Sequence, residues 1–126
     1  MIAVDTSALM AIVLNDPEAG ACIAALEAED ELVISAGTVA EALIVAARRN
    51  VRNEMELLIA GLGFEIVSVT AAAAQRIATA YRSWGKGMHP AALNFGDCFA
   101  YEVARQHDCP LLYVGDDFSR TDLRRA

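Results

Sequence analysis

Short, uninterrupted apolar runs that alternate with helical segments constrain this chain more than any other feature of its sequence. The residues of each run are apolar in a continuous stretch, which is typical of strands buried on both faces. Helices between such strands cover the two faces of a parallel sheet. We therefore predict an α/β fold, a three-layer α/β/α sandwich with a central parallel sheet of four to five strands. The expected strands are Ile2–Asp5, Leu32–Ser35, Phe64–Val69 and Leu111–Val114.

Capping residues and helix breakers divide the rest of the chain into helices. A short apolar helix, Ser7–Leu14, directly follows the first strand. Polar N-caps predict where five further helices begin. These caps are Asp16 (followed by Pro17), Thr38, Asn53, Thr70 and Asn94, and the helices are expected to end near Ala28, Arg49, Leu62, Trp84 and His107. No linker separates these elements, so we expect residues 1–126 to form a single domain.

Composition narrows the classes of protein to which the chain can belong. Hydrophobic residues make up 56 % of the 126 residues, which is enough for a packed core and excludes intrinsic disorder. An apolar stretch such as Thr38–Ala47 is interrupted by Glu41 and is too short to span a bilayer, so no membrane association is expected. Three cysteines without a C-x-x-C spacing, and a start without a basic segment, favour a cytoplasmic protein with no zinc site.

The net charge of the chain is −7, from seventeen acidic and ten basic residues, which at first sight argues against a nucleic-acid partner. Four acidic positions, however, fall at one edge of the predicted sheet. Asp5 ends the first strand, Glu41 lies in the first turn after the second, and Asp97 lies in the first turn of the last long helix. Asp116 and Asp117 directly follow the last strand. Ligands of parallel sheets gather at this edge, so we expect the acids to converge there.

Each acid alone has a structural explanation. Glu41 completes a capping box with Thr38, Asp97 suits the positive end of a helix, and Asp116 and Asp117 could form a turn. Asp5 fits such an explanation least, because an acid at the end of a buried strand is costly without a partner. Together, crowded carboxylates repel one another unless a cation neutralises them. Oxygen ligands without a cysteine or histidine cluster favour Mg²⁺ or Mn²⁺, a metal suited to phosphodiester chemistry.

Four segments of the chain carry a resemblance to a known family. They are Met1–Leu9 (MIAVDTSAL), the helix that holds Glu41, Leu93–Tyr101 (LNFGDCFAY) and Pro110–Phe118 (PLLYVGDDF). In this order and at this length, the chain resembles a PIN domain, and more closely the VapC toxins of bacterial type II toxin–antitoxin systems. One departure is Glu102, where a small or apolar residue is usual, and we expect that position to lie away from the site.

The resemblance implies an Mg²⁺- or Mn²⁺-dependent endoribonuclease that a VapB-type antitoxin holds inactive and that forms a homodimer. Asp5 and Asp97 match the principal metal ligands of the family, and Glu41 matches the third acid, which binds the metal directly or through water. The fourth acid is Asp116 or its neighbour Asp117, of which Asp116 is favoured. In the implied reaction, two or three acids hold Mg²⁺ and an activated water attacks the phosphorus.

Other polar residues have two interpretations each. Thr6 and Ser7 could hold a water or a phosphate oxygen, or could cap the first helix. His89, in the loop Gly85–Pro90, could contact substrate or could be a surface histidine of that loop. Arginine clusters could follow an RNA backbone or could be solvated helix ends. These clusters contain Arg48, Arg49 and Arg52; Arg82, with Lys86; and Arg120, Arg124 and Arg125.

Two alternative functions also follow from the acids, and one further surface is expected. Asp5 could be the covalent nucleophile of a phosphoryl-transfer enzyme, although no lysine follows a late strand. The acids could instead hold a structural cation in a binding module without catalysis. The apolar helices between Ala8 and Leu62 exceed what a small sheet needs, so we expect their outer faces to form the antitoxin groove and part of the dimer contact.

Overall fold

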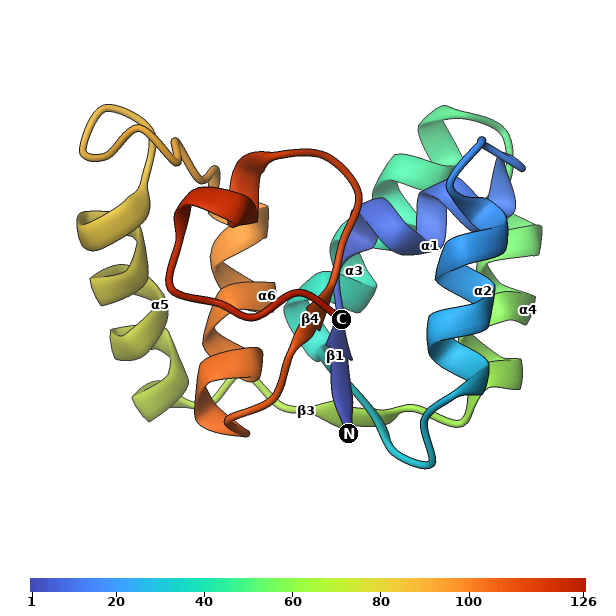
Figure 1. Ribbon diagram of the computed structural model, residues 1–126, viewed down its shortest axis with the longest axis horizontal. Coiled ribbons are helices and arrows are strands. Elements are labelled where there is room, and N and C mark those ends of the chain that lie inside the picture. The colour runs from blue at the N-terminus through green and yellow to red at the C-terminus, as the bar shows by residue number, and fades with distance from the viewer.

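In the computed structural model, which describes residues 1–126, six α-helices flank a four-stranded parallel sheet (Figure 1). The strands lie in the order β3-β2-β1-β4, and every neighbouring pair is parallel. This confirms the predicted α/β sandwich and fixes the number of strands at four. The strands are β1 (Ile2–Val4), β2 (Leu32–Ser35), β3 (Glu65–Val67) and β4 (Leu111–Leu112).

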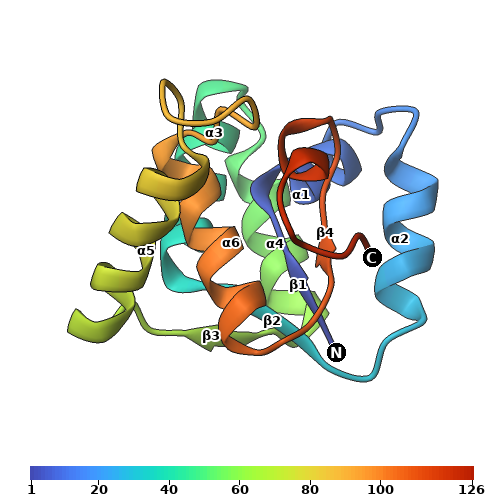
Figure 2. The same ribbon diagram turned by 60° about the vertical axis from the view of Figure 1, so that its left-hand side comes forward.

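The helices lie in two layers, one on each face of the sheet. Helices α1 to α4 cover one face and α5 and α6 cover the other, as Figures 1 and 2 show from two sides. The six helices are α1 (Thr6–Val13), α2 (Ala19–Glu27), α3 (Ala36–Arg48), α4 (Arg52–Leu62), α5 (Ala71–Trp84) and α6 (Phe95–Gln106). A 3₁₀ turn, η1 (Asp117–Arg120), follows β4. No helix combines the length and apolar character needed to cross a bilayer.

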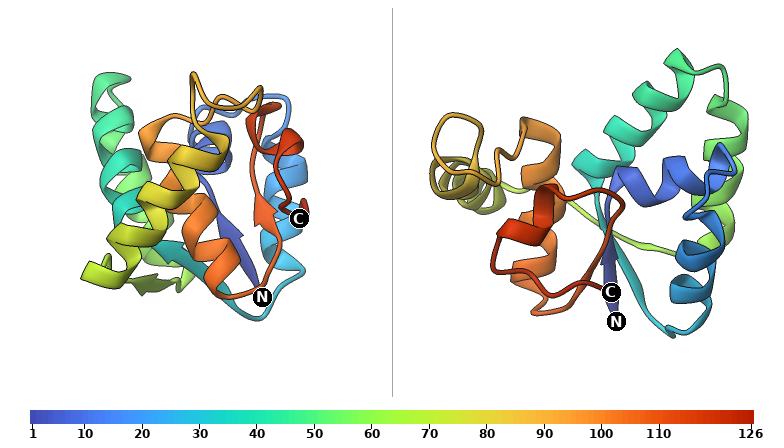
Figure 3. Two further views of the ribbon diagram at one scale, coloured as in Figure 1. Left: turned by 90° about the vertical axis from the view of Figure 1, so that its left-hand side faces the viewer. Right: turned by 45° about the horizontal axis from the view of Figure 1, so that its top comes forward.

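Alternate side chains of β1, β2 and β4 enter two separate apolar cores. In β1, Ile2 and Val4 pack into the core under α1 to α4, whereas Ala3 packs into the core under α5 and α6. Because successive side chains of a strand point to opposite faces, both layers need apolar residues, which explains the uninterrupted runs in the sequence. The right-hand view of Figure 3 shows the two helical layers on either side of the strands.

Two of the predicted helix starts are confirmed by their capping contacts. The Thr70 hydroxyl accepts the Ala73 N–H at 3.1 Å where α5 begins. At the start of α6, Asn94 and Asp97 form a reciprocal capping box, in which each side chain accepts the backbone N–H of the other. Both helices therefore begin where their N-cap residues predict.

Three other predicted caps are wrong. Ser35, not Thr38, caps α3 by accepting the Gly37 N–H at 3.1 Å, so Thr38 lies inside the helix and its buried hydroxyl has no partner. The residue before α4 is Val51, and Asn53 is already helical. Helix α2 begins at Ala19 because the Asp16 carbonyl accepts the Ala19 N–H in a preceding turn.

The strands are shorter than the apolar runs that predicted them. The third run, Phe64–Val69, contributes only Glu65–Val67 to the sheet, and the last run contributes only Leu111 and Leu112. The chain ends beside β4, where the Leu111 N–H donates to the Arg124 carbonyl and the Ala126 N–H donates to the Leu111 carbonyl. The last residues thus cover the outer edge of β4.

A candidate carboxylate site at the carboxyl edge of the sheet

Asp5 begins α1 immediately after β1 and is buried, with 3 % of its surface exposed. One carboxylate oxygen, Oδ2, accepts the Ser7 N–H at 3.0 Å and the Ser7 hydroxyl at 2.6 Å. The other oxygen, Oδ1, is buried without a hydrogen-bond partner. Burial raises the pKa of Asp5 to about 6, with the charge of Glu41 acting in the same direction and the Ser7 bonds opposing both. A buried, unpartnered carboxylate oxygen is costly unless a cation or a donor reaches it.

The Ser7 hydroxyl also connects two strands at this edge. It donates to Asp5 Oδ2 and accepts the Val114 N–H at 3.0 Å, so it bridges the end of β1 and the segment after β4. Asp5 itself caps α1, so neither of the two interpretations of Ser7 drawn from sequence describes this role. The bridge thus engages Oδ2 of Asp5 and leaves Oδ1 without a partner.

Glu41 lies in the second turn of α3, because the helix begins earlier than Thr38. Its Oε1 accepts the Thr6 hydroxyl at 2.6 Å, a contact between residues 35 positions apart. Its Oε2 lies against Gly96 on α6, where the Cβ of any side chain would overlap it. Glu41 therefore sits between the start of α1 and the start of α6.

Asp97 is in the first turn of α6, and 8 % of its surface is exposed. Its Oδ2 accepts the Asn94 N–H at 3.0 Å. Burial, together with the charges of Asp5, Asp117 and Glu41, raises the pKa of Asp97 to about 7, against the opposing effect of the Asn94 bond. Asp97 therefore lies within electrostatic reach of three other carboxylates, and their shared role at a metal site stays a prediction.

Asp116 and Asp117 differ in their places after β4. Gly115 turns the chain with φ at +98°, a left-handed conformation that favours glycine. Asp116 then precedes η1, and its carbonyl accepts the Ser119 hydroxyl at 2.6 Å. Both carboxylates are exposed, but Asp117, and not Asp116, is among the charges that raise the pKa of Asp97 most. The charge that acts on Asp97 therefore points to Asp117, whereas the sequence favoured Asp116.

The donor set of this region fits a hydrated divalent cation rather than a closed metal cage. No three aspartate, glutamate, histidine or cysteine side chains lie close enough together to enclose an ion by themselves. Mg²⁺ usually retains several waters and takes only one or two protein carboxylates. Asp5 Oδ1 is the buried carboxylate oxygen that lacks a partner, and none of the five ion pairs in the chain involves a site carboxylate. The oxygen-only donors exclude a thiolate or imidazole zinc site.

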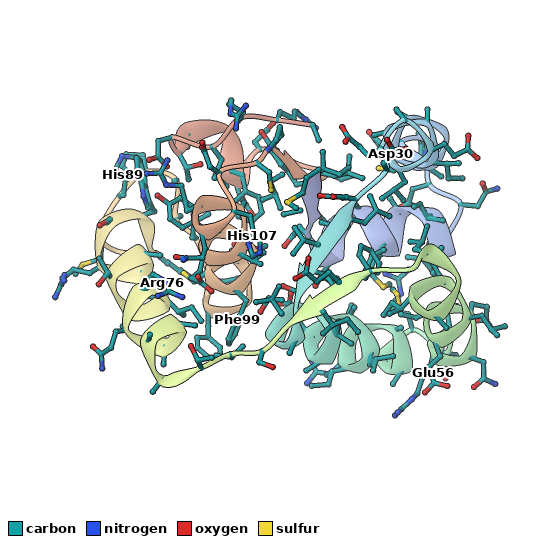
Figure 4. All side chains as sticks on the ribbon, turned by 90° about the horizontal axis from the view of Figure 1, so that it is seen from below. Asp30, Glu56, Arg76, His89, Phe99 and His107 are labelled. Carbon is teal, nitrogen blue, oxygen red and sulfur yellow. The ribbon has the colours of Figure 1, made fainter.

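His89 and three of the arginines that the sequence indicated as candidate substrate contacts bond to other parts of the chain. His89 is half-buried, its Nδ1 accepts the Ala91 N–H at 3.0 Å, and its ring packs edge-on against Trp84. Figure 4 labels it in the loop after α5. Arg120 ties this loop to η1 by donating to the Pro90 carbonyl at 3.1 Å. Arg124 and Arg125 contact the chain's own residues, Asp108 and Tyr113, near its end.

Glu102 lies away from the carboxylate site, as expected, but it is buried. It accepts from Arg76 on α5 at 3.1 Å, and Figure 4 labels Arg76 between the two helices. The three cysteines, Cys22, Cys98 and Cys109, are free and buried.

Sequence reasoning missed Gly96 and the contact that it makes. A glycine in the first turn of a predicted helix is unfavourable there, and such a residue often marks a close approach of another group. That signal was present in the sequence, but the approaching group, Glu41, is 55 residues away along the chain (96 − 41). Only the fold brings the two together.

Apolar side chains line grooves in two regions of the surface, one beside Glu41 and one between α1, α2 and α4. Phe95 and Phe99 on α6 stack edge-on at 4.9 Å and line two grooves, one with Val69 and Tyr81 and one with Ile44 and Glu41. We call the side chains of Ile44, Val69, Tyr81, Phe95 and Phe99 the aromatic patch. A third groove lies between α1, α2 and α4; apolar Ile12, Ile23, Leu26, Leu58 and Leu62 line it with acidic Glu27, Glu29 and Asp30.

The chain is similar in sequence to known proteins along most of its length. The chain matches the PIN domain family over residues 2–123. It is 45 % identical over 124 residues to ribonuclease VapC36 of Mycobacterium tuberculosis, covering 95 % of this chain and 89 % of that protein. It is 39 % identical over 123 residues to ribonuclease VapC30 of the same species, covering 95 % of this chain and 94 % of that protein.

Solved structures share the fold. The crystal structure of Mycobacterium tuberculosis VapC20, described as a Sarcin-Ricin loop cleaving toxin, has a TM-score of 0.82 at 16 % identity and covers 100 % of this chain and 98 % of its own. VapBC2 from Rickettsia felis, solved bound to a DNA fragment from its promoter, has a TM-score of 0.70 at 17 % identity, with 100 % and 98 % covered. At these identities the likeness concerns the fold alone.

Proposed function

Because this chain belongs to the PIN-domain family, and within it to the VapC ribonucleases, we propose that it is a toxin that cleaves RNA phosphodiester bonds internally with Mg²⁺ or Mn²⁺. The observation that carries this proposal is the cluster of Asp5, Glu41, Asp97 and Asp117 at the carboxyl edge of the sheet. In that cluster Asp5 presents a buried, unpartnered oxygen, and Asp97 has a raised pKa. Crowded carboxylates with these properties are suited to neutralisation by a cation.

Asp5 and Asp97 are the residues that would hold the cation. Asp5 offers Oδ1, because Ser7 occupies Oδ2, and Asp97 offers Oδ1, because Asn94 occupies its Oδ2. When bound, a divalent cation supplies positive charge for activating water and for stabilising charge at phosphorus. The hydrogen bonds on the far oxygens leave both carboxylates with one oxygen each for this purpose.

We assign to Glu41 the transfer of a proton from the attacking water. Thr6 holds its Oε1, so Oε2 is the oxygen that can orient the attacking water and accept its proton. The position of Glu41 between α1 and the first turn of α6 supports this assignment, since both site aspartates belong to those turns. The fourth acid is proposed to be Asp117, whose charge acts on Asp97, with Asp116 as the alternative.

Purified protein tests this function directly. With Mg²⁺ or Mn²⁺ the wild-type protein should cleave RNA internally, and excess chelator should stop the reaction until the metal is restored. Asp5→Asn and Asp97→Asn should each lower the cleavage rate by about 10²-fold or more, because each removes a charge that the cation needs. Full activity in both variants would contradict the site, and a trapped phospho-aspartate at Asp5 would favour phosphoryl transfer instead.

The groove between α1, α2 and α4 is proposed to bind a helix of a VapB-type antitoxin. Apolar side chains line its floor and the acids of residues 27–30 lie at its side, which suits an amphipathic helix that carries basic residues. If so, Ile23→Glu should retain RNA cleavage while losing inhibition by the cognate antitoxin. Unchanged inhibition of this variant would place the antitoxin elsewhere.

The aromatic patch is proposed to be the homodimer contact. Phe95 is 69 % exposed and Ile44 is 56 % exposed, which is unusual for large apolar side chains that adjoin one another on a surface. The patch shares a groove with Glu41, so a second copy there would extend the surface around the carboxylate site. A second copy bound there would therefore change the shape of the groove beside Glu41.

A further inference from the structure

The carboxylate of Glu41 is held from two directions by residues that carry no charge. Its Oε1 accepts the hydroxyl of buried Thr6 at 2.6 Å. Its Oε2 occupies the space in front of Gly96, where a side chain would stand. Helices α3 and α6 come together here, so the carboxylate is brought to the first turn of α6, one residue before Asp97.

Gly96 has no conformational reason to be glycine. The glycines with positive φ are Gly63, Gly87 and Gly115, and Gly96 is not among them. Gly20 occupies the same second position of α2, but a Cβ there would meet nothing within 4 Å. Gly96 therefore differs from a matched helical glycine only in the group that lies in front of it, which is the Glu41 carboxylate.

We propose that Gly96 and Thr6 are positioning residues for Glu41: together they set the location of its carboxylate beside Asp97. This inference rests on the proposed function, in which Glu41 Oε2 acts on the attacking water. A side chain at position 96 would displace Oε2, and loss of the Thr6 hydroxyl would release Oε1. Neither change would remove a charged group of the site.

Cleavage kinetics test the catalytic half of this inference. Gly96→Ala should lower kcat by about 10–100-fold, the usual cost of losing a group that orients a site residue, while KM for RNA stays within about twofold. Gly20→Ala is the matched control and should keep wild-type kinetics. Thr6→Val should lower kcat in the same way, and Thr6→Ser, which restores the hydroxyl, should recover most of the rate. Wild-type kcat in Gly96→Ala would overturn the inference.

Melting temperatures of the four proteins in a double-mutant cycle test the contact without using activity. In the wild-type protein, Gly96→Ala should change the melting temperature less favourably than in the Glu41→Ala background, because the methyl group displaces the Glu41 carboxylate. In the Glu41→Ala background the same change should raise it, because alanine is the better helix former and the overlap is gone. Equal shifts in both backgrounds would overturn the contact. An inactive wild-type protein would instead contradict the proposed function and leave this cycle's outcome unaffected.

Discussion

Among single residues, Asp5 and Asp97 were the most predictable acids of the candidate site, because Asp5 directly follows a strand and Asp97 lies in the first turn of a helix. Asp5 and Asp97 lie where the sequence predicts, and the Asn94–Asp97 capping box could be read from the residues alone. The Thr6–Glu41 bond could not, because it joins residues 35 positions apart. The choice between Asp116 and Asp117 was equally hidden, since it depends on how the chain turns at Gly115 and η1 after β4.

That choice leads to a prediction for the two neighbouring aspartates. Asp117→Asn should lower RNA cleavage by about 10–100-fold, because it removes a charge that acts on Asp97. Asp116→Asn should change the rate by less than about twofold, since the Asp116 contact in η1 uses its backbone carbonyl. Initial cleavage rates at fixed Mg²⁺ and RNA measure both variants. The reverse order of effects would assign the fourth acid to Asp116.

Among the helices and strands, the type of every strand and α-helix was predictable from apolar runs and capping residues, whereas the η1 turn and several boundaries were not. Ser35 is the last residue of β2 and also the cap of α3, so the helix begins directly from the strand and Thr38 loses the capping role. Strand β3 lies at the edge of the sheet and pairs with β2 alone, through Glu65, Ile66 and Val67. Edge position and direct strand-to-helix connection depend on the tertiary fold, which single residues do not encode.

A prediction about assembly concerns the aromatic patch, which lies on the surface shared by α3, α5 and α6. Phe95→Glu should convert a dimer into a monomer, because it places a charge in the centre of the aromatic patch. Light scattering during size-exclusion chromatography measures the mass of both proteins. Leu57→Glu, which changes an exposed apolar residue of α4, is the control and should leave the mass unchanged. A wild-type protein that is monomeric at micromolar concentration would contradict the proposed contact.

For the whole molecule, the net charge of −7 no longer argues against a nucleic-acid partner once the acids are located. Four of the seventeen acidic residues belong to the carboxylate site, and a bound cation would offset part of their charge. Three more lie beside the groove between α1, α2 and α4. At physiological salt, charges are screened over about 8 Å, so the local field at a site matters more than the total. The acidic composition is therefore compatible with an RNA substrate.

The same carboxylates predict how the stability of the whole chain depends on pH. Burial raises the pKa of Asp5 to about 6 and that of Asp97 to about 7, so the folded chain binds more protons than the unfolded chain from about pH 4 to 7. Without divalent cations, the free energy of unfolding contributed by these groups should be fully present below about pH 4 and be lost as the pH rises to 7. Urea titrations across this range measure the slope.

A control separates these two groups from the other titrating residues. Asp97→Asn should flatten the fall in the free energy of unfolding between pH 5 and pH 7, because the substituted amide does not ionise. Mg²⁺ should restore stability at pH 7 in the wild-type protein more than in this variant. A slope that is the same in both proteins would contradict the raised pKa of Asp97.

The central claim is that the carboxylate site cleaves RNA, and mapping new RNA ends in cells tests it most directly. Brief expression of the wild-type protein should produce new internal ends at a small set of positions, together with growth arrest. Expression of Asp97→Asn at the same level should produce neither. New ends and growth arrest of equal strength in both strains, with both proteins folded and equally abundant, would contradict the account.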